Sequence, residues 1–229
     1  MITSAANPRL KLVRKLASRR QREKLRLFVS EGEDLVDAAL AAGLEPVDLL
    51  VAGETVASEA LASVSTLPHP ARRMAVFRRA DLPRYEQRAV ALALWHVADP
   101  GNLGTLIRSA DAFGAAVALS AGCADPVGPK ALRASAGAVF RVPLGGFEAP
   151  AGRWVALVPH GGRPLAEVEL AEPIVFVLGA EREGLPAEVL ERCDDAATIP
   201  TQGPAESLNV AIAGAIALYE WHRRRTHRT

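Results

Sequence analysis

Short, wholly apolar runs separated by polar turns dominate the second half of the chain. They cover residues 90–97, 116–119, 154–158 and 174–178, and helical or loop segments alternate with them. Runs that are apolar throughout, rather than at every second position, are typical of strands in a parallel sheet covered on both faces. The last periodic segment, 207–225, predicts a long Ala-rich helix. We therefore expect an α/β unit built on a parallel sheet.

The first part of the chain shows the same alternation on a smaller scale. Its apolar spacing predicts a helix from Asn7 to about Lys24, a strand over 25–30, a helix ending at Gly43, a strand over 47–52, a short helix over 56–61 and a strand over 74–77. The polar, proline-containing segment 81–85 is the candidate linker. We expect a small α/β domain over residues 1–82 and a larger domain over 88–229.

Composition narrows the class of protein. The chain has 229 residues, of which 49% are hydrophobic and 23% charged, as in a soluble globular protein. No apolar run reaches the roughly 20 residues that span a bilayer, and the N-terminus lacks the apolar core of a secretory signal. Cys123 and Cys193 form no redox motif, and the five histidines lack ligand spacing. We expect a cytoplasmic protein with reduced thiols and no metal.

The net charge of +1 conceals a strong asymmetry. The first 26 residues hold nine bases and one acid, a charge of +8, and the rest of the chain carries −7. Such an asymmetry favours a polyanionic partner, most often a nucleic acid, although a solvated helix surface has the same composition. The candidate RNA-binding residues are Arg9, Lys11, Arg14, Lys15, Arg19, Arg20 and Arg22.

Three polar segments containing glycine follow predicted strands. They are Asp99 to Gly114, with Asn102 and Arg108 among apolar positions; Leu178 to Leu185, with Glu181; and Ile199 to Val210, with Ser207 and Asn209. The first segment predicts a helix opening between Asn102 and Thr105, and Glu206 or Ser207 is the candidate cap of the last helix. Loops at the carboxyl ends of parallel strands meet to form a ligand crevice. The pattern therefore indicates a site without naming its reaction.

Known short motifs do not explain these segments. The chain lacks the Gly-Lys-Ser/Thr of a phosphate-binding loop, the glycine pattern of a dinucleotide turn and the Gly-x-Ser-x-Gly of a hydrolase nucleophile. Taken singly, the glycines are ordinary turn residues, Arg108 a surface arginine and Glu181 an exposed loop acid.

Taken together, the three segments closely resemble the signature motifs of the SpoU (TrmH) family of the SPOUT superfamily, which are RNA ribose 2′-O-methyltransferases. The N-terminal part resembles the L30e-like substrate-binding domain of many members, through Ile2-Thr3-Ser4, Asn7-Pro8 and Phe28 to Gly32. The resemblance implies a deep trefoil knot in the C-terminal domain, bound S-adenosylmethionine and a homodimer whose active site joins loops of two subunits.

The resemblance also implies roles for individual residues. Arg108 corresponds to the catalytic arginine, and its motif partners are Asn102, Glu181, Ser207 and Asn209. The expected cofactor pocket consists of Val158, Pro159, His160, Gly161, Leu178, Gly179, Ile199, Ser207 and Leu208. Arg182 stands where glycine is frequent in the family and adds a charge near the site.

An arginine side chain is a poor base, because its pKa exceeds about 12. Our hypothesis is that Arg108 binds a substrate phosphate and stabilises the developing alkoxide. Two alternatives remain open at this point: a non-catalytic RNA-binding or ribosome-associated protein, and a methyltransferase of this fold that acts on a base. The motif around Ser207 and Asn209 favours ribose, and the L30e-like domain favours rRNA over tRNA.

Overall fold

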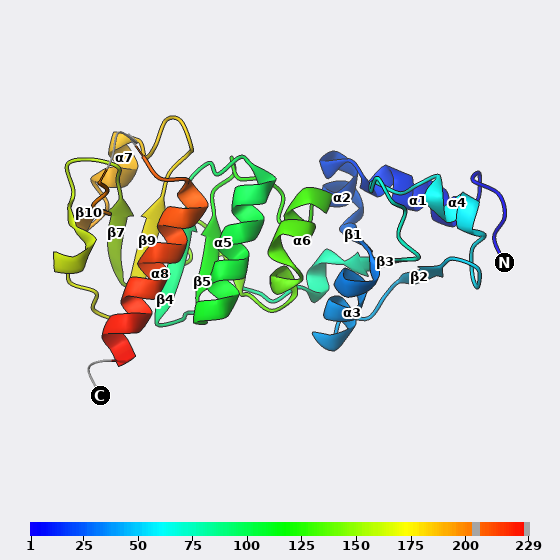
Figure 1. The fold of residues 1–229 in the computed structure, drawn as a ribbon, viewed down its shortest axis with the longest axis horizontal. Coiled ribbons are helices and arrows are strands. Elements are labelled where there is room, and N and C mark those ends of the chain that lie inside the picture. The colour runs from blue at the N-terminus through cyan, green and yellow to red at the C-terminus, as the bar shows by residue number, and fades with distance from the viewer. Residues whose placement is uncertain (203–206, 227–229) are drawn as a thin grey trace.

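The molecule consists of two units, each built on a different kind of sheet (Figure 1). The structure, a computed structural model, describes residues 1–202 and 207–226. The N-terminal unit, residues 1–81, contains an antiparallel three-stranded sheet in the order β1-β3-β2. Its elements are α1 (Pro8–Leu16), α2 (Arg19–Leu25), β1 (Leu27–Glu31), α3 (Glu33–Ala41), β2 (Asp48–Val51), α4 (Ser58–Ala62), β3 (Arg73–Arg78) and the 3-10 turn η1 (Arg79–Asp81). Residues 82–89 then continue without helix or strand.

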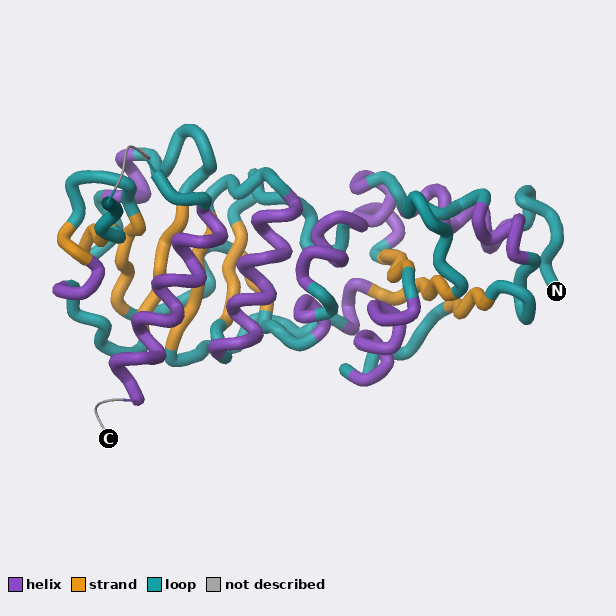
Figure 2. Tube along the Cα trace, in the orientation of Figure 1, coloured by secondary structure: helices purple, strands orange, loops and turns teal. Residues whose placement is uncertain are grey.

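The C-terminal unit, residues 90–226, contains a seven-stranded sheet in the order β6-β5-β4-β9-β7-β10-β8, and all its strand pairs are parallel. Its elements are β4 (Val90–Leu94), α5 (Pro100–Phe113), β5 (Ala116–Leu119), α6 (Pro129–Ser135), η2 (Ala138–Phe140), β6 (Leu144–Gly146), β7 (Arg153–Leu157), β8 (Arg163–Pro164), η3 (Leu165–Glu167), β9 (Ile174–Leu178), α7 (Ala187–Leu190), β10 (Asp195–Thr198) and α8 (Val210–Thr226). The predicted parallel α/β unit is confirmed. The tube view shows α5 and α8 together on one face of this sheet (Figure 2).

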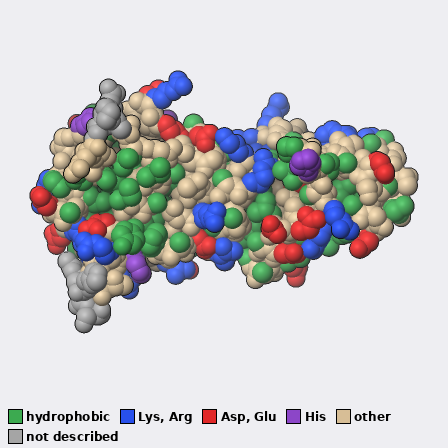
Figure 3. Space-filling view, viewed as in Figure 1, with side chains coloured by type: hydrophobic (Ala, Val, Ile, Leu, Met, Phe, Trp, Pro, Cys, Tyr) green, Lys and Arg blue, Asp and Glu red, His purple; other side chains and the backbone are tan. Residues whose placement is uncertain are grey.

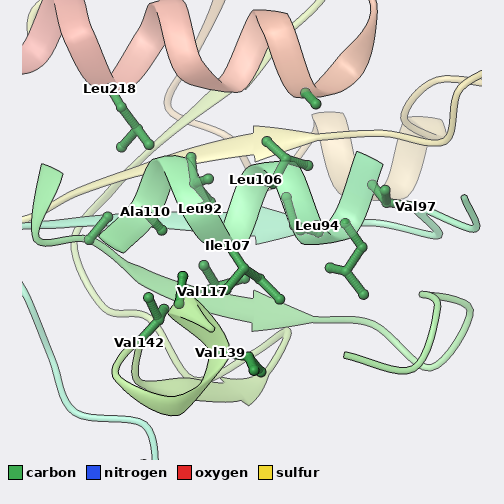
Figure 4. Packing of buried hydrophobic residues seen from close by; sticks show 14 of the residues in the cluster. Leu92, Leu94, Val97, Leu106, Ile107, Ala110, Val117, Val139, Val142 and Leu218 are labelled. Carbon is green, nitrogen blue, oxygen red and sulfur yellow. The ribbon is translucent and has the colours of Figure 1, made fainter. Parts of the chain in front are cut away.

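Both faces of the large sheet are covered, as the continuous apolar runs predicted. On one face, Leu92 of β4 and Val117 of β5 belong to the same buried cluster as Leu106 and Ile107 of α5 and Leu218 of α8 (Figure 4). The other face carries a second cluster that includes Phe147 and Trp154, whose rings meet edge to face. The central strands β4 and β9 are therefore enclosed on both faces, and the segments that follow them begin from a packed core.

The core also runs between the two units. Phe28 of β1 and Phe77 of β3 have ring centroids 5.7 Å apart, and Phe28 lies 6.1 Å from Phe140 of η2 in the C-terminal unit. All three rings are buried. The N-terminal unit is therefore packed against the C-terminal unit.

The predicted single helix from Asn7 to Lys24 is wrong: the chain leaves the helical path at Ala17 and Ser18, where α1 gives way to α2. Ser18 is extended, and the Arg22 guanidinium donates from Nη1 to the carbonyls of Leu16 and Ala17, at 2.8 Å each. Those carbonyls lie at the C-terminal end of α1, where helices leave acceptors unpaired. Arg22 thus stabilises the break.

Candidate active site

The first polar segment forms the start of α5. This helix begins at Pro100, before the predicted opening at Asn102, and Asp99 is its cap. The Asp99 carboxylate accepts from the amides of Gly101 at 2.7 Å and Asn102 at 2.9 Å, and it pairs with Lys130 at 2.9 Å. The hydrogen bond from Lys130, followed by those from the amides, lowers the pKa of Asp99. Asn102 is thereby fixed in the first helical turn.

Three side chains from three distant segments meet at the carboxyl ends of β4 and β9. Asn102 donates from Nδ2 to Oε1 of Glu181 at 3.1 Å, and Asn209 donates from Nδ2 to Oδ1 of Asn102 at 3.0 Å. The amide of Asp99 also donates to Glu181 at 3.3 Å. We call Asn102, Glu181 and Asn209 the polar junction. It unites the three segments that the sequence placed in one crevice.

The polar junction keeps Glu181 ionised. Partial burial raises the pKa of this carboxyl, but hydrogen bonds from Asn102 and from backbone amides, including that of Asp99, outweigh it, so the pKa lies below its ordinary value. An ionised carboxylate accepts hydrogen bonds and donates none. Glu181 therefore fixes the Asn102 amide with its nitrogen toward Glu181 and its oxygen toward Asn209.

The start of α8 differs from the prediction. This helix begins at Val210, so Ser207 and Asn209 precede its first turn rather than lying in it. Asn209 caps it, because Oδ1 accepts from the amides of Ala211 at 2.9 Å and Ile212 at 3.3 Å. Glu206, the other predicted cap, lies outside the described residues. The Asn209 side chain thus binds Asn102 and its own helix simultaneously.

A cleft of about 410 Å³ opens beside the polar junction. Seven of the nine predicted cofactor residues line it, namely Val158, Pro159, Leu178, Gly179, Ile199, Ser207 and Leu208. His160 and Gly161 are not among the lining residues. The cleft is also lined by Arg182 and by residues that the sequence did not single out, namely Leu157, Ala180, Gly184, Ala197, Thr201, Val210 and Ala213. Three of these seven, Leu157, Ala180 and Val210, directly follow or precede a predicted position, whereas the other four adjoin none and carried no such signal.

The cleft suits a ligand with an apolar body and a few polar groups. Its volume lies in the usual range for small-molecule sites, and its wall combines aliphatic side chains with loop backbone. Gly179 forms part of that wall by necessity, because a Cβ there would lie 2.2 Å from the carbonyl carbon of Gly184. Ala180 and Gly184 exchange backbone hydrogen bonds of 3.0 and 3.1 Å, which close the loop. S-adenosylmethionine, with its adenine and aliphatic chain, fits this wall.

Arg108 does not reach the polar junction within this chain. It lies six residues beyond Asn102, about 9 Å along the helix axis. Its side chain is exposed on α5, and over residues 1–202 and 207–226 it has no hydrogen bond or ion pair. Arg108 also does not line the cleft. The guanidinium therefore remains available to a ligand or to another molecule.

The seven predicted RNA-binding bases fall into three groups. Lys11, Arg14, Lys15 and Arg20 are exposed and have no side-chain partner within the described part of the chain. Arg9 is bound to Asp48, while Arg19 binds Glu23 and the Cys123 carbonyl. Figure 3 shows Lys and Arg side chains along the edge formed by α1 and α2.

Arg22 is the exception, and its prediction as an RNA-binding residue is wrong. It is only 4% exposed and pairs with Asp125 of the C-terminal unit at 2.7 Å. A guanidinium enclosed in this way has no surface left for a phosphate. The sequence could not predict the burial of Arg22, because Arg22 is the same residue type as the exposed Arg20.

The described residues contain no group of three or more His, Cys, Asp or Glu side chains able to hold a metal ion. Burial raises the pKa of the Cys123 thiol, and it raises that of Cys193 to about 11. Both thiols are free and protonated at neutral pH. Over the part of the chain described, no helix is long and apolar enough to cross a membrane.

Comparison with known proteins agrees with this geometry. Residues 89–219 match the SpoU rRNA Methylase family, and residues 7–78 match the MRM3-like substrate binding domain. The 23S rRNA (guanosine(2553)-2′-O)-methyltransferase RlmP of Bacillus subtilis is 33% identical, with 95% of this chain and 97% of RlmP covered.

Two solved structures bind the same cofactor on the same fold. The AdoMet-bound rRNA methyltransferase of Sinorhizobium meliloti superimposes with a TM-score of 0.87 and 30% identity, covering 97% of each chain. The SpoU methyltransferase AviRb of Streptomyces viridochromogenes, in complex with AdoMet, gives 0.83 and 25%, covering 96% of this chain and 98% of AviRb. With three motif segments joined at one sheet edge and a family match over 89–219, the chain belongs to the SpoU rRNA methylase family.

Proposed function

We propose that this protein transfers the methyl group of S-adenosylmethionine to a ribose 2′-hydroxyl of RNA, with ribosomal RNA as its substrate. The observation that carries the proposal is the polar junction, which brings the three motif segments together beside the cleft. The choice of rRNA is supported by the family description and by the activity named for RlmP. RNA rather than DNA follows from the acceptor, because only ribose carries a 2′-hydroxyl.

The residues of the cleft and junction have distinct roles in this proposal. Val158, Pro159, Leu178, Gly179, Ile199, Ser207 and Leu208 hold the cofactor, chiefly through apolar contact and backbone groups. When bound, S-adenosylmethionine supplies an electrophilic methyl group on a positively charged sulfur. Asn102, Glu181 and Asn209 fix the loops that surround the acceptor ribose. Such orientation accounts for much of the rate that an enzyme gains when it brings two reactants together.

Arg108 acts on the RNA. An exposed guanidinium without a protein partner is suited to bidentate binding of a phosphate oxygen pair. Its positive charge also stabilises the alkoxide that develops as the hydroxyl attacks. Because Arg108 lies outside the junction in this chain, we assign the complete active site to a homodimer in which the two subunits bring these parts together.

The exposed face of α8 supports the dimer. Ile212 and Tyr219, seven residues apart and thus on the same side of the helix, are 52% and 56% exposed. Figure 3 shows hydrophobic side chains gathered over α8, beside α5. Apolar patches of this kind commonly mark protein interfaces. Charged substitutions at both positions should yield a monomer in sedimentation experiments.

Domain assignment follows the two units. We assign residues 1–82 to a substrate-binding domain and 88–229 to the methyltransferase domain, which the ranges of the two family matches support. The family resemblance also supports a trefoil knot in the second domain and, with rRNA as substrate, a cytoplasmic location.

Methyl transfer to 23S rRNA tests the proposal. The purified protein is incubated with a 23S rRNA transcript and labelled S-adenosylmethionine, and the digested nucleosides are identified by mass spectrometry. We expect a 2′-O-methylnucleoside. A methyl group on a base, or no S-adenosylmethionine binding in calorimetry, would overturn the assignment.

A further inference from the structure

The boundary between the two units contains a buried ionic cluster that no step of the reaction uses. Asp125, in the connection between β5 and α6, accepts from Arg22 of α2 at 2.7 Å and from Arg79 of η1 at 3.1 Å. The side chains of Asp125 and Arg22 are only 4% and 5% exposed, and that of Arg79 is 24% exposed. Two arginines of the N-terminal unit thus bind one carboxylate of the C-terminal unit.

Hydrogen bonds occupy both carboxylate oxygens of Asp125 and several donors of Arg22, so the cluster fixes the relative orientation of the groups it joins. Asp125 uses one oxygen for Arg22 and the other for Arg79 and the amide of Val127, at 3.2 Å. Arg22 also donates to the carbonyls at the end of α1, as described above. Buried ion pairs contribute little net stability compared with apolar packing, and in some proteins they specify one arrangement among several. The packed rings of Phe28, Phe77 and Phe140 supply non-directional apolar contact between the same two units.

The same connection is hydrogen-bonded to the end of β4 and to the loop between β4 and α5. The amide of Ala124 donates to the carbonyl of Val97 at 2.9 Å, and that of Ser120 donates to Leu94 at 3.0 Å. At the far end of the connection, Lys130 of α6 binds Asp99, the cap of α5. A short, hydrogen-bonded path therefore leads from Arg22 to the helix that carries Asn102.

We propose that Arg22, Arg79 and Asp125 are positioning residues that fix the basic helices α1 and α2 at one distance and angle from the active site. The exposed bases of those helices then bind RNA phosphates only in an arrangement that places the target ribose in the crevice. This inference rests on the proposed function. It predicts that loosening the cluster weakens productive RNA binding and leaves the cofactor site unchanged.

Asp125→Asn in the full-length protein is the principal test. The substitution keeps the shape and removes the charge that both arginines bind. With a 23S rRNA transcript, we expect KM for RNA to rise about tenfold or more, because RNA binding must then also order the two units. We expect kcat and the Kd of S-adenosylmethionine to change less than about twofold, because the bound complex has the same crevice.

Asp111→Asn is the matched control, because Asp111 forms an exposed pair with Arg141 inside the C-terminal unit. It should leave all three constants within about twofold of the wild type. Small-angle X-ray scattering should show a larger radius of gyration for Asp125→Asn alone. An unchanged KM for RNA in a folded Asp125→Asn protein, or equal losses in kcat and cofactor affinity, would overturn the proposal.

Arg79→Gln covers the case in which Asp125→Asn does not fold, since it leaves the Arg22 pair intact. We expect about a threefold rise in KM for RNA, with kcat unchanged. Filter binding of the same transcript and the scattering measurement require no methyl transfer. If the wild type binds RNA but methylates nothing, the proposed function fails, whereas weaker RNA binding and an expanded shape in the variants still support the positioning role. Wild-type RNA binding and compactness in Arg79→Gln contradict it.

Discussion

The two units of the molecule use polar side chains in opposite ways. On α1 and α2 of the N-terminal unit, Lys11, Arg14, Lys15 and Arg20 project into solvent without protein partners among the described residues. In the C-terminal unit, Asn102, Glu181 and Asn209 are bonded to one another at one sheet edge. Dispersed charges bind a polyanion additively and respond to salt, whereas a bonded constellation depends on each member's position. Binding and chemistry should therefore be separable by mutation.

Arg108→Ala should produce the largest effect, because it removes the one exposed cation that we place at the reacting ribose. We expect kcat to fall at least about a hundredfold, as when a preorganised charge is removed from an active site. RNA affinity should change less than about threefold, since many other phosphate contacts remain. Single-turnover methylation and filter binding measure the two quantities.

Arg141→Ala is the control for this variant. Arg141 is exposed and is paired with Asp111 of α5, the helix that also carries Arg108. It should keep near wild-type kcat. A dimeric Arg108→Ala enzyme that methylates at the wild-type rate would remove Arg108 from the site.

Gly179→Ala should affect the cofactor alone. The added Cβ would lie 2.2 Å from the Gly184 carbonyl carbon and 2.6 Å from the Leu185 nitrogen, so the loop that lines the cleft must shift. Overpacking of this kind costs about 1–3 kcal/mol, and if that cost falls on the bound state, S-adenosylmethionine affinity measured by calorimetry should drop about fivefold to 150-fold. RNA binding should be unchanged. Gly146→Ala is the matched control, because a Cβ there meets no atom within 4 Å.

Neutralising Arg14, Lys15 and Arg20 together, each to Gln, should weaken RNA binding and leave cofactor binding unchanged. We expect RNA affinity to fall about tenfold at moderate salt and the slope of log K against log salt to decrease by about 2. S-adenosylmethionine affinity should stay within about twofold of the wild type. The control neutralises Arg88, Arg163 and Arg192, which are exposed bases outside the N-terminal unit. Equal RNA losses in both triple variants would show that only net charge matters.

Local sequence pattern predicted much of the C-terminal unit. The runs 116–119 and 174–178 coincide with β5 and β9, because residues that are buried on both faces of a sheet must be apolar throughout. The grouping of Asn102, Glu181 and Asn209 at one edge followed from parallel topology together with the family resemblance. In contrast, β10 was not predicted, because Asp195 to Thr198 contains two alanines and an aspartate, which have low strand propensity. Pairing with β7 stabilises it as a strand.

The break at Ala17 and Ser18 could not be predicted from the sequence around it. The apolar helical spacing ends at Ala17, and the wholly polar segment 18–24 does not reveal a change of helix direction. The break is stabilised by Arg22, whose main partner Asp125 is 103 residues away. In the sequence, an exposed arginine that is available to RNA and an arginine that binds a buried carboxylate are the same residue type at similar spacing. Only tertiary contact distinguishes them, which is why the predicted RNA-binding set included the buried Arg22 together with exposed bases.

The smallest effect concerns the far end of α8, the helix that Asn209 caps. Hydrogen bonding from Arg223, followed by Arg224, lowers the pKa of Glu220 from 4.5 to about 2, although partial burial opposes this shift. A carboxyl whose pKa is lower in the folded protein stabilises it above pH 4.5, and that contribution is lost as the pH falls toward 2. Arg224 also donates to the carbonyls of Leu165 and Val168. The Glu220–Arg224 pair therefore helps to hold the end of α8 against η3 and the residue that follows it.

Glu220→Gln should therefore lower the free energy of unfolding at pH 7 by about 1 kcal/mol, allowing for solvent screening of an exposed Arg223. Urea unfolding at pH 7 and pH 3 should show a smaller pH dependence in the variant than in the wild type. Glu148→Gln, which removes a more exposed pair with Arg192, should change the stability less. Cofactor and RNA affinity at pH 7 should be unchanged in both, because the polar junction lies at the opposite end of α8. An altered cofactor affinity in Glu220→Gln would show that the two ends of α8 are coupled.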